Sequence, residues 1–330
     1  MGKNEILIVS EEEVTNLLSI SDAIKIVEET FRTHDKGRTA MPNPACIHMN
    51  NESLFMAMPA YVATIGIVGV KWLAAFPENP KKYGIPSHLG LIVLNDEHTS
   101  LPMAVMGGNW ITAARTAAVT AIGAKYLAKR DAKTVGIIGA GVQAATNLEA
   151  LNEVLCIDLV KVTSLREKTR KHFAATMTEK FGLKVIPVNN SDEVVKGADI
   201  VVNATPANQP FLKEELAAQG LLFINLGTHQ GCDDKFPKKA DKIILDTLQG
   251  FTALGWGNFA DLLRRGIVTT KDVYAEIGQI VSGRKIGRNS DYERILFFHG
   301  GMAVNDIAVA HEVYNRALEN GIGRNIRIFS

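Results

Sequence analysis

Cysteine is scarce in this chain, and the cysteines that it has are far apart. The 330 residues include three, Cys46, Cys156 and Cys232, and neither a CxxC nor an HExxH pattern occurs. Such a set indicates neither a disulfide framework nor a zinc site. We therefore expect a protein that holds no metal ion.

Long apolar runs and export signals are missing as well. No stretch approaches the roughly 20 apolar residues that a membrane-spanning helix needs. The start, MGKNEILIVSEEEV, lacks the apolar core of a signal peptide and the hydroxyl residue of a myristoylation signal. The net charge is +1 and no basic run occurs, which argues against nucleic-acid binding. We predict a cytoplasmic protein that binds neither membranes nor nucleic acids.

The composition is that of an ordinary globular enzyme, with 46% hydrophobic and 22% charged residues. One hydrophobic core rarely serves a chain of 330 residues, so we expect two domains. Residues 11–36 have the pattern of two helices, capped by Ser10 and by Ser19 or Ser21. Short strand-like segments follow between residues 45 and 94, and one long helix built from small residues is expected over 112–129.

From residue 134 onwards, short apolar segments alternate with helices. Strands are expected at TVGII, LVKVTS, KVIPV and DIVVNAT, and further strands near LLFINL and KIILD. Helices are expected over 142–155, 167–181, 191–196, 270–281 and 301–320. This alternation predicts an α/β fold with a doubly wound parallel sheet of the Rossmann type, beside an α+β domain. The last helix is expected to pack onto the first domain.

A glycine loop joins the first of these strands to the first of these helices. Its sequence, GAGVQA from Gly139 to Ala144, fits the pattern GxGxxA. Gly139 permits a tight turn, Gly141 lets the backbone approach a pyrophosphate, and Ala144 allows the helix and the strand to touch. The free N–H groups at the start of the helix would then face the phosphates. A chance glycine turn is the alternative, but the surrounding βαβ pattern favours a dinucleotide site.

The second strand of this region ends without the acidic residue that NAD-binding proteins usually carry there. Ser164 is followed instead by Arg166, Lys168 and Thr169, which suit the 2′-phosphate of NADP. The alternative is a solvated helix start, with Glu167 turned inward. We predict a preference for NADP(H), with NAD(H) as the second choice.

Two cations are isolated in apolar sequence. Lys71 is the one charge in GIVGVKWLAAF, and Arg115 is the one charge in WITAARTAAVTAIGA. Because a buried unpaired charge is costly, each cation must meet an internal carboxylate, reach water, or face a cavity that an anion fills. Together they predict a clamp for a substrate carboxylate, with Arg115 bidentate and Lys71 as a point charge.

Three further polar residues have settings of interest. Asp306, in GGMAVNDIAVA, is a third isolated charge, and it could hold a cation, orient a protonated nitrogen, or form a structural salt bridge. His229, in NLGTHQG, follows a strand at the edge of the sheet where such folds bind ligands. His88, in GIPSHLG, is a candidate site residue in the same way, and a solvated loop histidine is the alternative for both.

The segments GVKW, FPENP, IPSHLGLIVLND, ITAARTAA, GAGVQA, NATP and HGGMAVND, in this order, resemble the ornithine cyclodeaminase/mu-crystallin family over nearly the whole chain. The resemblance implies a substrate-binding and dimerisation domain over residues 1–118, completed by 306–330. It also implies a dinucleotide-binding Rossmann domain over residues 119–305. A homodimer is expected, because the N-terminal sheets of two subunits meet in this family.

The resemblance also implies roles for individual residues. Lys71 and Arg115 match the residues that bind the substrate carboxylate, and Met56 and His88 are expected in the same site. Residues Gly301 to Val304 are expected near the nicotinamide. The expected cofactor contacts are Ser87, Thr112, Gly139, Ala140, Gly141, Val142, Gln143, Ser164, Arg166, Lys168, Thr169, Thr205, Gly227 and Gly301.

The chain departs from the cyclodeaminases of this family at three places. No Arg or Lys follows the Met41-Pro42 pair, although Arg38 stands nearby as a substitute. Met56 or a neighbour replaces a Glu, and His229 replaces a catalytic Asp. Those acidic residues suit the second amine of ornithine, so their loss favours imine reduction or amino-acid oxidation.

We therefore expect an NAD(P)-dependent oxidoreductase that transfers hydride to or from the Cα of a 2-imino acid or a cyclic ketimine carboxylate. Lys71, Arg115 and His229 are the predicted catalytic residues, with His229, or a bound water in its place, as the proton donor to nitrogen. Two alternatives stay open. One is ornithine cyclodeamination with recycled NAD⁺, and the other is a protein that binds NADPH and a small acid without turnover.

Overall fold

The computed structural model describes residues 5–49, 53–207, 209–226, 231–254 and 257–328. Within these residues the chain forms two compact units, and each unit contains one eight-stranded sheet. Unit 1 comprises Met1–Arg115 and Met302–Ser330, and unit 2 comprises Thr116–Gly301. The predicted fold class, a Rossmann-type parallel sheet beside an α+β unit, is confirmed.

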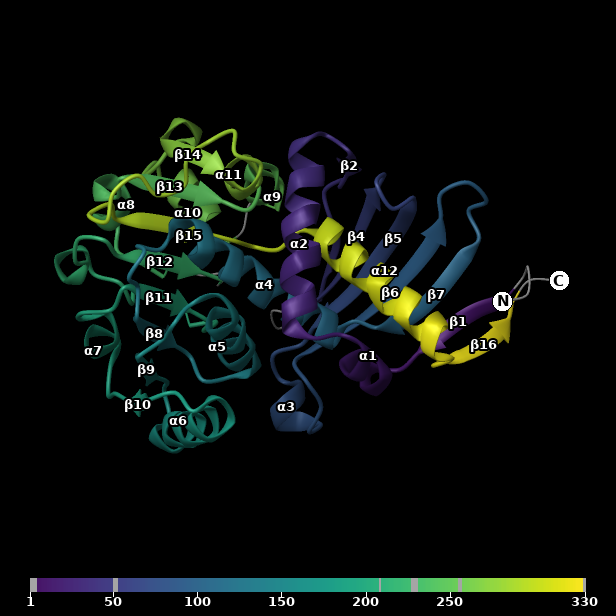
Figure 1. The fold of residues 1–330 in the computed structure, drawn as a ribbon, viewed down its shortest axis with the longest axis horizontal. Coiled ribbons are helices and arrows are strands. Elements are labelled where there is room, and N and C mark those ends of the chain that lie inside the picture. Colours follow the sequence, from purple (N-terminus) through teal and green to yellow (C-terminus); the bar gives the residue numbers. More distant parts are fainter. Residues whose placement is uncertain (1–4, 50–52, 208, 227–230, 255–256, 329–330) are drawn as a thin grey trace. The chain divides into compact units, whose positions relative to one another are not determined.

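The sheet of unit 1 takes strands from both ends of the chain. Its order is β16-β1-β7-β6-β5-β4-β2, with β3 paired to β4. β1 pairs parallel with β7 and antiparallel with β16, so the first and last strands lie side by side (Figure 1). The strands are β1 (Glu5–Val9), β2 (Thr39–Ala40), β3 (Ala45–His48), β4 (Leu54–Val62), β5 (Ile67–Ala75), β6 (His88–Asp96), β7 (Pro102–Gly107) and β16 (Arg324–Arg327).

Helix α12 (Ala303–Asn320) crosses strands β4 to β6 on one face of this sheet, and α2 (Ile20–Asp35) packs against α12 (Figure 1). A Cβ on Gly69 of β5 would stand 2.6 Å from the Ile307 side chain, so α12 lies close to the strand there. Ser10 and Ser19 cap α1 (Glu11–Leu17) and α2, which confirms the predicted helix pair. The remaining helices are α3 (Asn79–Lys82) and α4 (Asn109–Leu127), which continues into unit 2.

The two faces of the unit 1 sheet differ in what they expose. Alternate residues of a strand share a face, so Lys71 faces α12, as Gly69 does. The opposite face leaves apolar side chains exposed, among them Trp72 (39% exposed) and Leu91 (52% exposed), which are paired across β5 and β6. An apolar surface of this kind indicates an interaction site.

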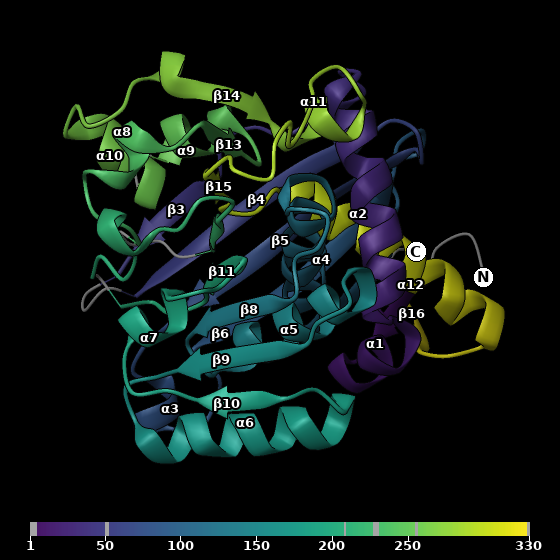
Figure 2. The ribbon, with the colours of Figure 1, turned by 60° about the vertical axis from the view of Figure 1, so that its left-hand side comes forward.

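The sheet of unit 2 is parallel at every described strand pair, in the order β10-β9-β8-β11-β12-β15-β13-β14. The chain runs outward from β8 to β10 (Figure 2) and then returns to β11 on the other side of β8. Ligands of such sheets bind at this change of direction, beside the carboxyl ends of the strands. The strands are β8 (Thr134–Ile138), β9 (Leu159–Thr163), β10 (Val185–Pro187), β11 (Ile200–Asn203), β12 (Leu222–Asn225), β13 (Lys242–Leu245), β14 (Val273–Glu276) and β15 (Ile295–Phe298).

The helices of unit 2 follow the predicted alternation over most of its length. They are α5 (Val142–Val154), α6 (Glu167–Phe181), α7 (Ser191–Val195), α8 (Phe236–Lys239), α9 (Leu248–Leu254), α10 (Asn258–Arg264) and α11 (Ile277–Val281), with 3₁₀ turns at Glu214–Leu216 and Thr270–Asp272. The helix predicted over 270–281 is wrong, because Val273–Glu276 forms β14. The apolar spacing there fits a helix, but β13 offers a parallel partner, and pairing with it overrides the local pattern.

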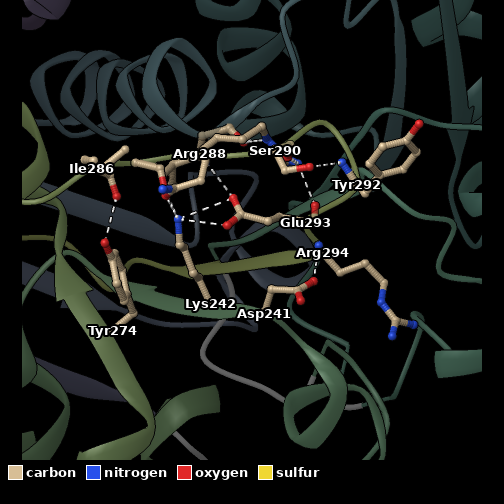
Figure 3. Close-up of polar contacts among 12 residues, drawn as sticks. Asp241, Lys242, Tyr274, Ile286, Arg288, Ser290, Tyr292, Glu293 and Arg294 are labelled. Atoms are coloured by element: carbon tan, nitrogen blue, oxygen red, sulfur yellow. Dashed lines mark hydrogen bonds and ion pairs between the residues drawn. The ribbon is translucent and has the colours of Figure 1, made fainter.

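Unit 2 contains a buried lysine whose ammonium is fully hydrogen-bonded. Lys242, at the start of β13, is 7% exposed. Its ammonium donates to Gly287 O at 2.6 Å and to Asn289 Oδ1 at 2.5 Å, and it pairs with the Glu293 carboxylate at 3.1 Å (Figure 3). An ammonium has three hydrogens, so this cation finds its full set of acceptors within the protein.

Candidate active site

Three charged side chains meet inside unit 1. Lys71 and Asp306 are fully buried, and Arg115 is 6% exposed. Lys71 Nζ lies 2.8 Å from Oδ1 of Asp306, and Nε of Arg115 donates a hydrogen bond of 3.0 Å to the same oxygen. We call these three residues the triad. Two cations share one carboxylate, so the triad has a formal charge of +1.

Each member of the triad is held by a regular element. Lys71 lies in the middle of β5, and Asp306 lies in the first turn of α12. Arg115 lies on α4, where the carboxylate of Glu11 accepts a 2.5 Å hydrogen bond from the backbone N–H of Trp110. A carboxylate at a helix N-terminus satisfies free N–H groups and the helix dipole. Glu11 therefore fixes the start of α4 and, with it, the position of Arg115.

Two polar atoms of the triad have contacts left to make among the described residues. Apart from its 2.8 Å ion pair with Asp306, Lys71 Nζ has no hydrogen-bond acceptor in the described part of the chain. Oδ2 of Asp306 is also buried without a partner in the described part of the chain. Lys242, by contrast, has acceptors on all sides. Unpaired buried charges are costly, so the triad has the character of a ligand site rather than a closed salt bridge.

The environment of the triad changes the acidity of Lys71. Desolvation in the protein interior lowers the pKa of Lys71 to about 8. The Asp306 carboxylate opposes this shift, and the positive charge of Arg115 adds to it. The ammonium form therefore prevails at neutral pH and gives way in mildly alkaline solution. A cation of this kind can hold an anion and can also exchange a proton near neutrality.

Two predicted substrate residues share the face of Lys71. Met56 is 3% exposed, and Met58, two positions along β4, pairs directly with Lys71. His88 starts β6, four positions before Ile92, the residue that pairs with Lys71 on the other side. His88 is exposed at the start of β6, and partial desolvation of its ring, followed by the positive charge of Lys71, lowers the pKa of His88. The two residues therefore stay candidates for the same site.

The other predicted residues of unit 1 lie outside the triad. Ser87 Oγ lies 3.1 Å from His88 Nδ1. Thr112 donates its hydroxyl to Gly108 O at the start of α4. Arg38, the proposed substitute for a missing clamp residue, is exposed and is not among the described partners of Asp306.

The glycine loop of unit 2 has the geometry of a phosphate site. Gly139 has a φ of +115°, and a Cβ there would stand 2.6 Å from Ala204 O at the end of the neighbouring β11. Gly141 caps α5 without a side-chain bond, and a Cβ on it would meet no atom within 4 Å. The space beside Gly141 at the start of α5 is therefore open, and Val142 is exposed there, as a bound pyrophosphate requires.

The tip of β9 presents cations and no inward acid among its described residues. Glu167 pairs with Lys171 at 2.6 Å on the outside of α6, so it does not take the place of the usual ribose acid. Ser164 Oγ donates a hydrogen bond to Arg166 O. The backbone carbonyl of Ser164 accepts a hydrogen bond from Arg170, a residue outside the predicted set. Arg166, Lys168 and Thr169 are exposed at this tip.

The carboxyl ends of the unit 2 strands gather further polar groups. Asn203 and Asn225 end adjacent strands β11 and β12 and are joined by a 2.6 Å hydrogen bond, and Oδ1 of Asn203 is buried without a described partner. Asp246 accepts hydrogen bonds from the N–H groups of Gly300 (2.9 Å) and Gly301 (2.8 Å). Each of these three polar side chains ends a buried strand or directly follows one, which is the sequence signal that could have identified it.

Some expectations cannot be placed. His229 and Gly227 lie outside the described residues, so their roles stay predictions. Thr205 follows β11, and its hydroxyl accepts a hydrogen bond from Ala207 N at 3.3 Å.

Among the described residues no group of His, Cys, Asp and Glu could hold a metal ion. The described helices also include none with the length and apolar character that a membrane span requires.

Comparison with known proteins extends the resemblance to the whole chain. Residues 4–321 match the ornithine cyclodeaminase/mu-crystallin family. The chain is 36% identical to the alanine dehydrogenase of Archaeoglobus fulgidus, over 98% of this chain and 99% of that protein. It is similar to the structure of Thermococcus litoralis Delta(1)-pyrroline-2-carboxylate reductase in complex with NADH and L-proline, with a TM-score of 0.93, 34% identity and coverage of 97% and 100%.

A second solved structure, an archaeal alanine dehydrogenase dimer with bound NAD, gives a TM-score of 0.91 with 35% identity and coverage of 98% and 100%. Both units are thus matched in sequence and in fold. The predicted resemblance is confirmed, and the chain belongs to the ornithine cyclodeaminase/mu-crystallin family.

Proposed function

We propose that this protein reduces the C=N bond of a 2-imino acid or cyclic ketimine carboxylate and oxidises the matching amino acid in reverse. It is an NAD(P)-dependent oxidoreductase acting on carbon–nitrogen bonds, the class of its alanine dehydrogenase and pyrroline-2-carboxylate reductase relatives. The observation that carries the proposal is the buried triad, whose formal charge of +1 needs an anion.

The substrate carboxylate would be that anion. Arg115 binds Asp306 through Nε alone among described residues, so its two Nη groups can hold a carboxylate in the bidentate manner. The Lys71 ammonium, whose one described partner is the Asp306 carboxylate, would add a second contact. Two cations on separate rigid elements fix both the position and the direction of a small acid, and such orientation supplies a large part of enzymatic rate enhancement.

The dinucleotide would be held by the glycine loop and by the N-terminus of α5, because Gly141 leaves the space that a pyrophosphate needs. When bound, its nicotinamide supplies or accepts the hydride. We propose a preference for NADP(H), supported by exposed Arg166 and Lys168 and by the outward pairing of Glu167. The relatives whose structures contain NADH and NAD make NAD(H) the alternative.

The cyclodeaminase reaction is the less favoured candidate. Met56 is buried on the face of Lys71, where the second amine of ornithine would need an acid rather than an apolar side chain. His229 stays a predicted proton donor to the substrate nitrogen. We also propose a homodimer, formed through the exposed apolar face of the unit 1 sheet, and a location in the cytoplasm.

One experiment tests the function. Loss of reduced-nicotinamide absorbance is followed with NADPH and with NADH against pyruvate plus ammonia, pyrroline-2-carboxylate and piperideine-2-carboxylate. A parallel assay supplies ornithine with NAD⁺ and measures ammonia. Imine-dependent oxidation supports the proposal. Ammonia release without net nicotinamide change indicates cyclodeamination, and tight cofactor binding with no turnover indicates a binding protein.

A further inference from the structure

Asp306 carries an unsatisfied acceptor in the middle of the triad. The residue is fully buried, and its Oδ1 takes both cations. Its Oδ2 is also buried, and no described residue donates a hydrogen bond to it. A buried acceptor left without a donor destabilises the folded protein, and it does so more strongly when it is charged. A donor from outside the protein would remove that cost.

The shape of the ion pair argues against a purely structural role. An arginine that is paired with a carboxylate frequently donates two parallel N–H groups to its two oxygens. Arg115 instead reaches one oxygen through Nε, and Lys71 approaches that same oxygen. This arrangement leaves Oδ2 free while the aspartate stays fixed beside the two cations.

The first turn of α12 has a second residue that lacks partners. Asn305 is 0% exposed, and neither its Oδ1 nor its Nδ2 has a hydrogen-bond partner among the described residues. Two consecutive buried side chains with unfilled hydrogen-bonding capacity indicate that the start of α12 borders a ligand rather than packed protein.

The proposed substrate carries the missing donor. A 2-imino acid has a carboxylate and a nitrogen on the same carbon, so a carboxylate held by the two cations brings its nitrogen near their shared aspartate. The imine must be protonated to accept hydride at Cα, and a neighbouring carboxylate favours the protonated form. We propose that Oδ2 of Asp306 accepts the N–H of the substrate iminium, and of the amine in the reverse direction.

This inference rests on the proposed function, because it takes the triad to be the carboxylate site. In this arrangement Oδ1 of Asp306 positions the two cations, and Oδ2 accepts a hydrogen bond from the substrate nitrogen. The protein would thereby distinguish an amino or imino acid from an equally sized acid without nitrogen.

The test compares ligands that differ only at the nitrogen. Affinities of the NADH-saturated enzyme for L-proline and cyclopentanecarboxylate, and for L-alanine and propionate, are measured by calorimetry for wild type and Asp306→Asn. The substitution should weaken the amino acids at least about tenfold, the value of a hydrogen bond to a charged group. It should leave the nitrogen-free acids unchanged or tighter, because the triad gains positive charge.

A second variant controls for the change in the charge of the triad. Lys71→Met combined with Asp306→Asn keeps the formal charge of the triad at that of the wild type, and its ratio of amino-acid to nitrogen-free affinity should fall by the same factor. Equal changes for both ligands of a pair, or an unchanged ratio, would overturn the inference and leave the carboxylate clamp intact. Failure of wild type to bind any of the four acids would overturn the clamp and the inference together.

Discussion

Arg115 donates a hydrogen bond to Asp306 through Nε alone, 3.0 Å from Oδ1, and no Nη hydrogen bond to this carboxylate is described. The aspartate therefore fixes the guanidinium without using its fork. A salt bridge and a ligand clamp, which the sequence presented as alternatives, are compatible in this geometry. The Asp306 carboxylate fixes the positions of the two cations, and the net positive charge of the triad stays available to a substrate carboxylate.

Removal of either cation should damage catalysis and spare the cofactor. Arg115→Ala and Lys71→Met should each lower kcat/KM by about 2–4 kcal/mol, or roughly 30- to 1,000-fold, because a desolvated charged contact is lost. Arg115→Lys should be nearly as damaging, since an ammonium cannot form the bidentate contact. Steady-state kinetics and NADPH titration check both statements.

The chain offers matched controls for these variants. Arg316 pairs with Asp22 at 2.7 Å in the same unit, and Lys242 is the buried lysine of unit 2. Arg316→Ala and Lys242→Met should lower the melting temperature and leave kcat/KM close to that of wild type. Normal kcat/KM in folded Arg115→Ala would contradict the clamp.

Alkaline pH should weaken binding of carboxylates. The charged form of lysine is the protonated one, and the pKa of Lys71 is lowered to about 8 mainly by desolvation. As pH rises through 8, the triad loses a positive charge, so the affinity for L-proline should fall between pH 8 and pH 10. In Lys71→Arg this decline should disappear, because a guanidinium stays protonated there. Calorimetry with NADH as cofactor checks the profile, and the same decline in Lys71→Arg would assign it to another group.

Cofactor preference should depend on the tip of β9. Arg166→Ala and Lys168→Ala should each weaken NADPH several-fold and leave NADH nearly unchanged, because only NADPH carries the 2′-phosphate. Lys171→Ala is the matched control, since Lys171 is engaged by Glu167 on the same helix. Fluorescence titration gives both dissociation constants. An equal loss for NADPH and NADH would remove the 2′-phosphate argument.

Charge on the open face of the unit 1 sheet should disrupt the dimer. Leu91→Asp together with Trp72→Glu places charges on an exposed apolar surface and should yield monomers at micromolar concentration. Ile286, which is 63% exposed in unit 2, gives the control Ile286→Asp, which should stay dimeric. Light scattering measures the mass, and a monomeric wild-type protein would contradict the proposal at once.

Local sequence patterns predict the elements that they themselves determine. Gly139 and Gly141 predict a phosphate loop because a tight turn and a close approach of the backbone to a ligand each require glycine. Ser10 and Ser19 mark helix starts because their hydroxyls cap free N–H groups. Isolated cations in apolar sequence indicate a buried charge site for the same kind of reason, since burial of a charge needs compensation.

What the sequence does not reveal depends on contacts between distant segments. Nothing local shows that Asp306 is the partner of Lys71 and Arg115, which lie far away in the chain. Strand β14 looks helical until β13 is present to pair with it. Strand β15 is a run of only four apolar residues, which cannot be told from a buried helical turn by pattern alone.

Because β16 pairs with β1 and α12 supplies Asp306, unit 1 cannot be completed until the ribosome has synthesised residues 303–327. Unit 2, Thr116–Gly301, lies between the two parts and can form first. At usual translation rates, its 186 residues delay the C-terminal part by roughly 10 to 40 seconds. During that interval Lys71 and Arg115 have no counter-charge and the sheet lacks its covering helix. A nascent chain in that state should depend on chaperones, and a chain that ends before Met302 should never acquire the triad.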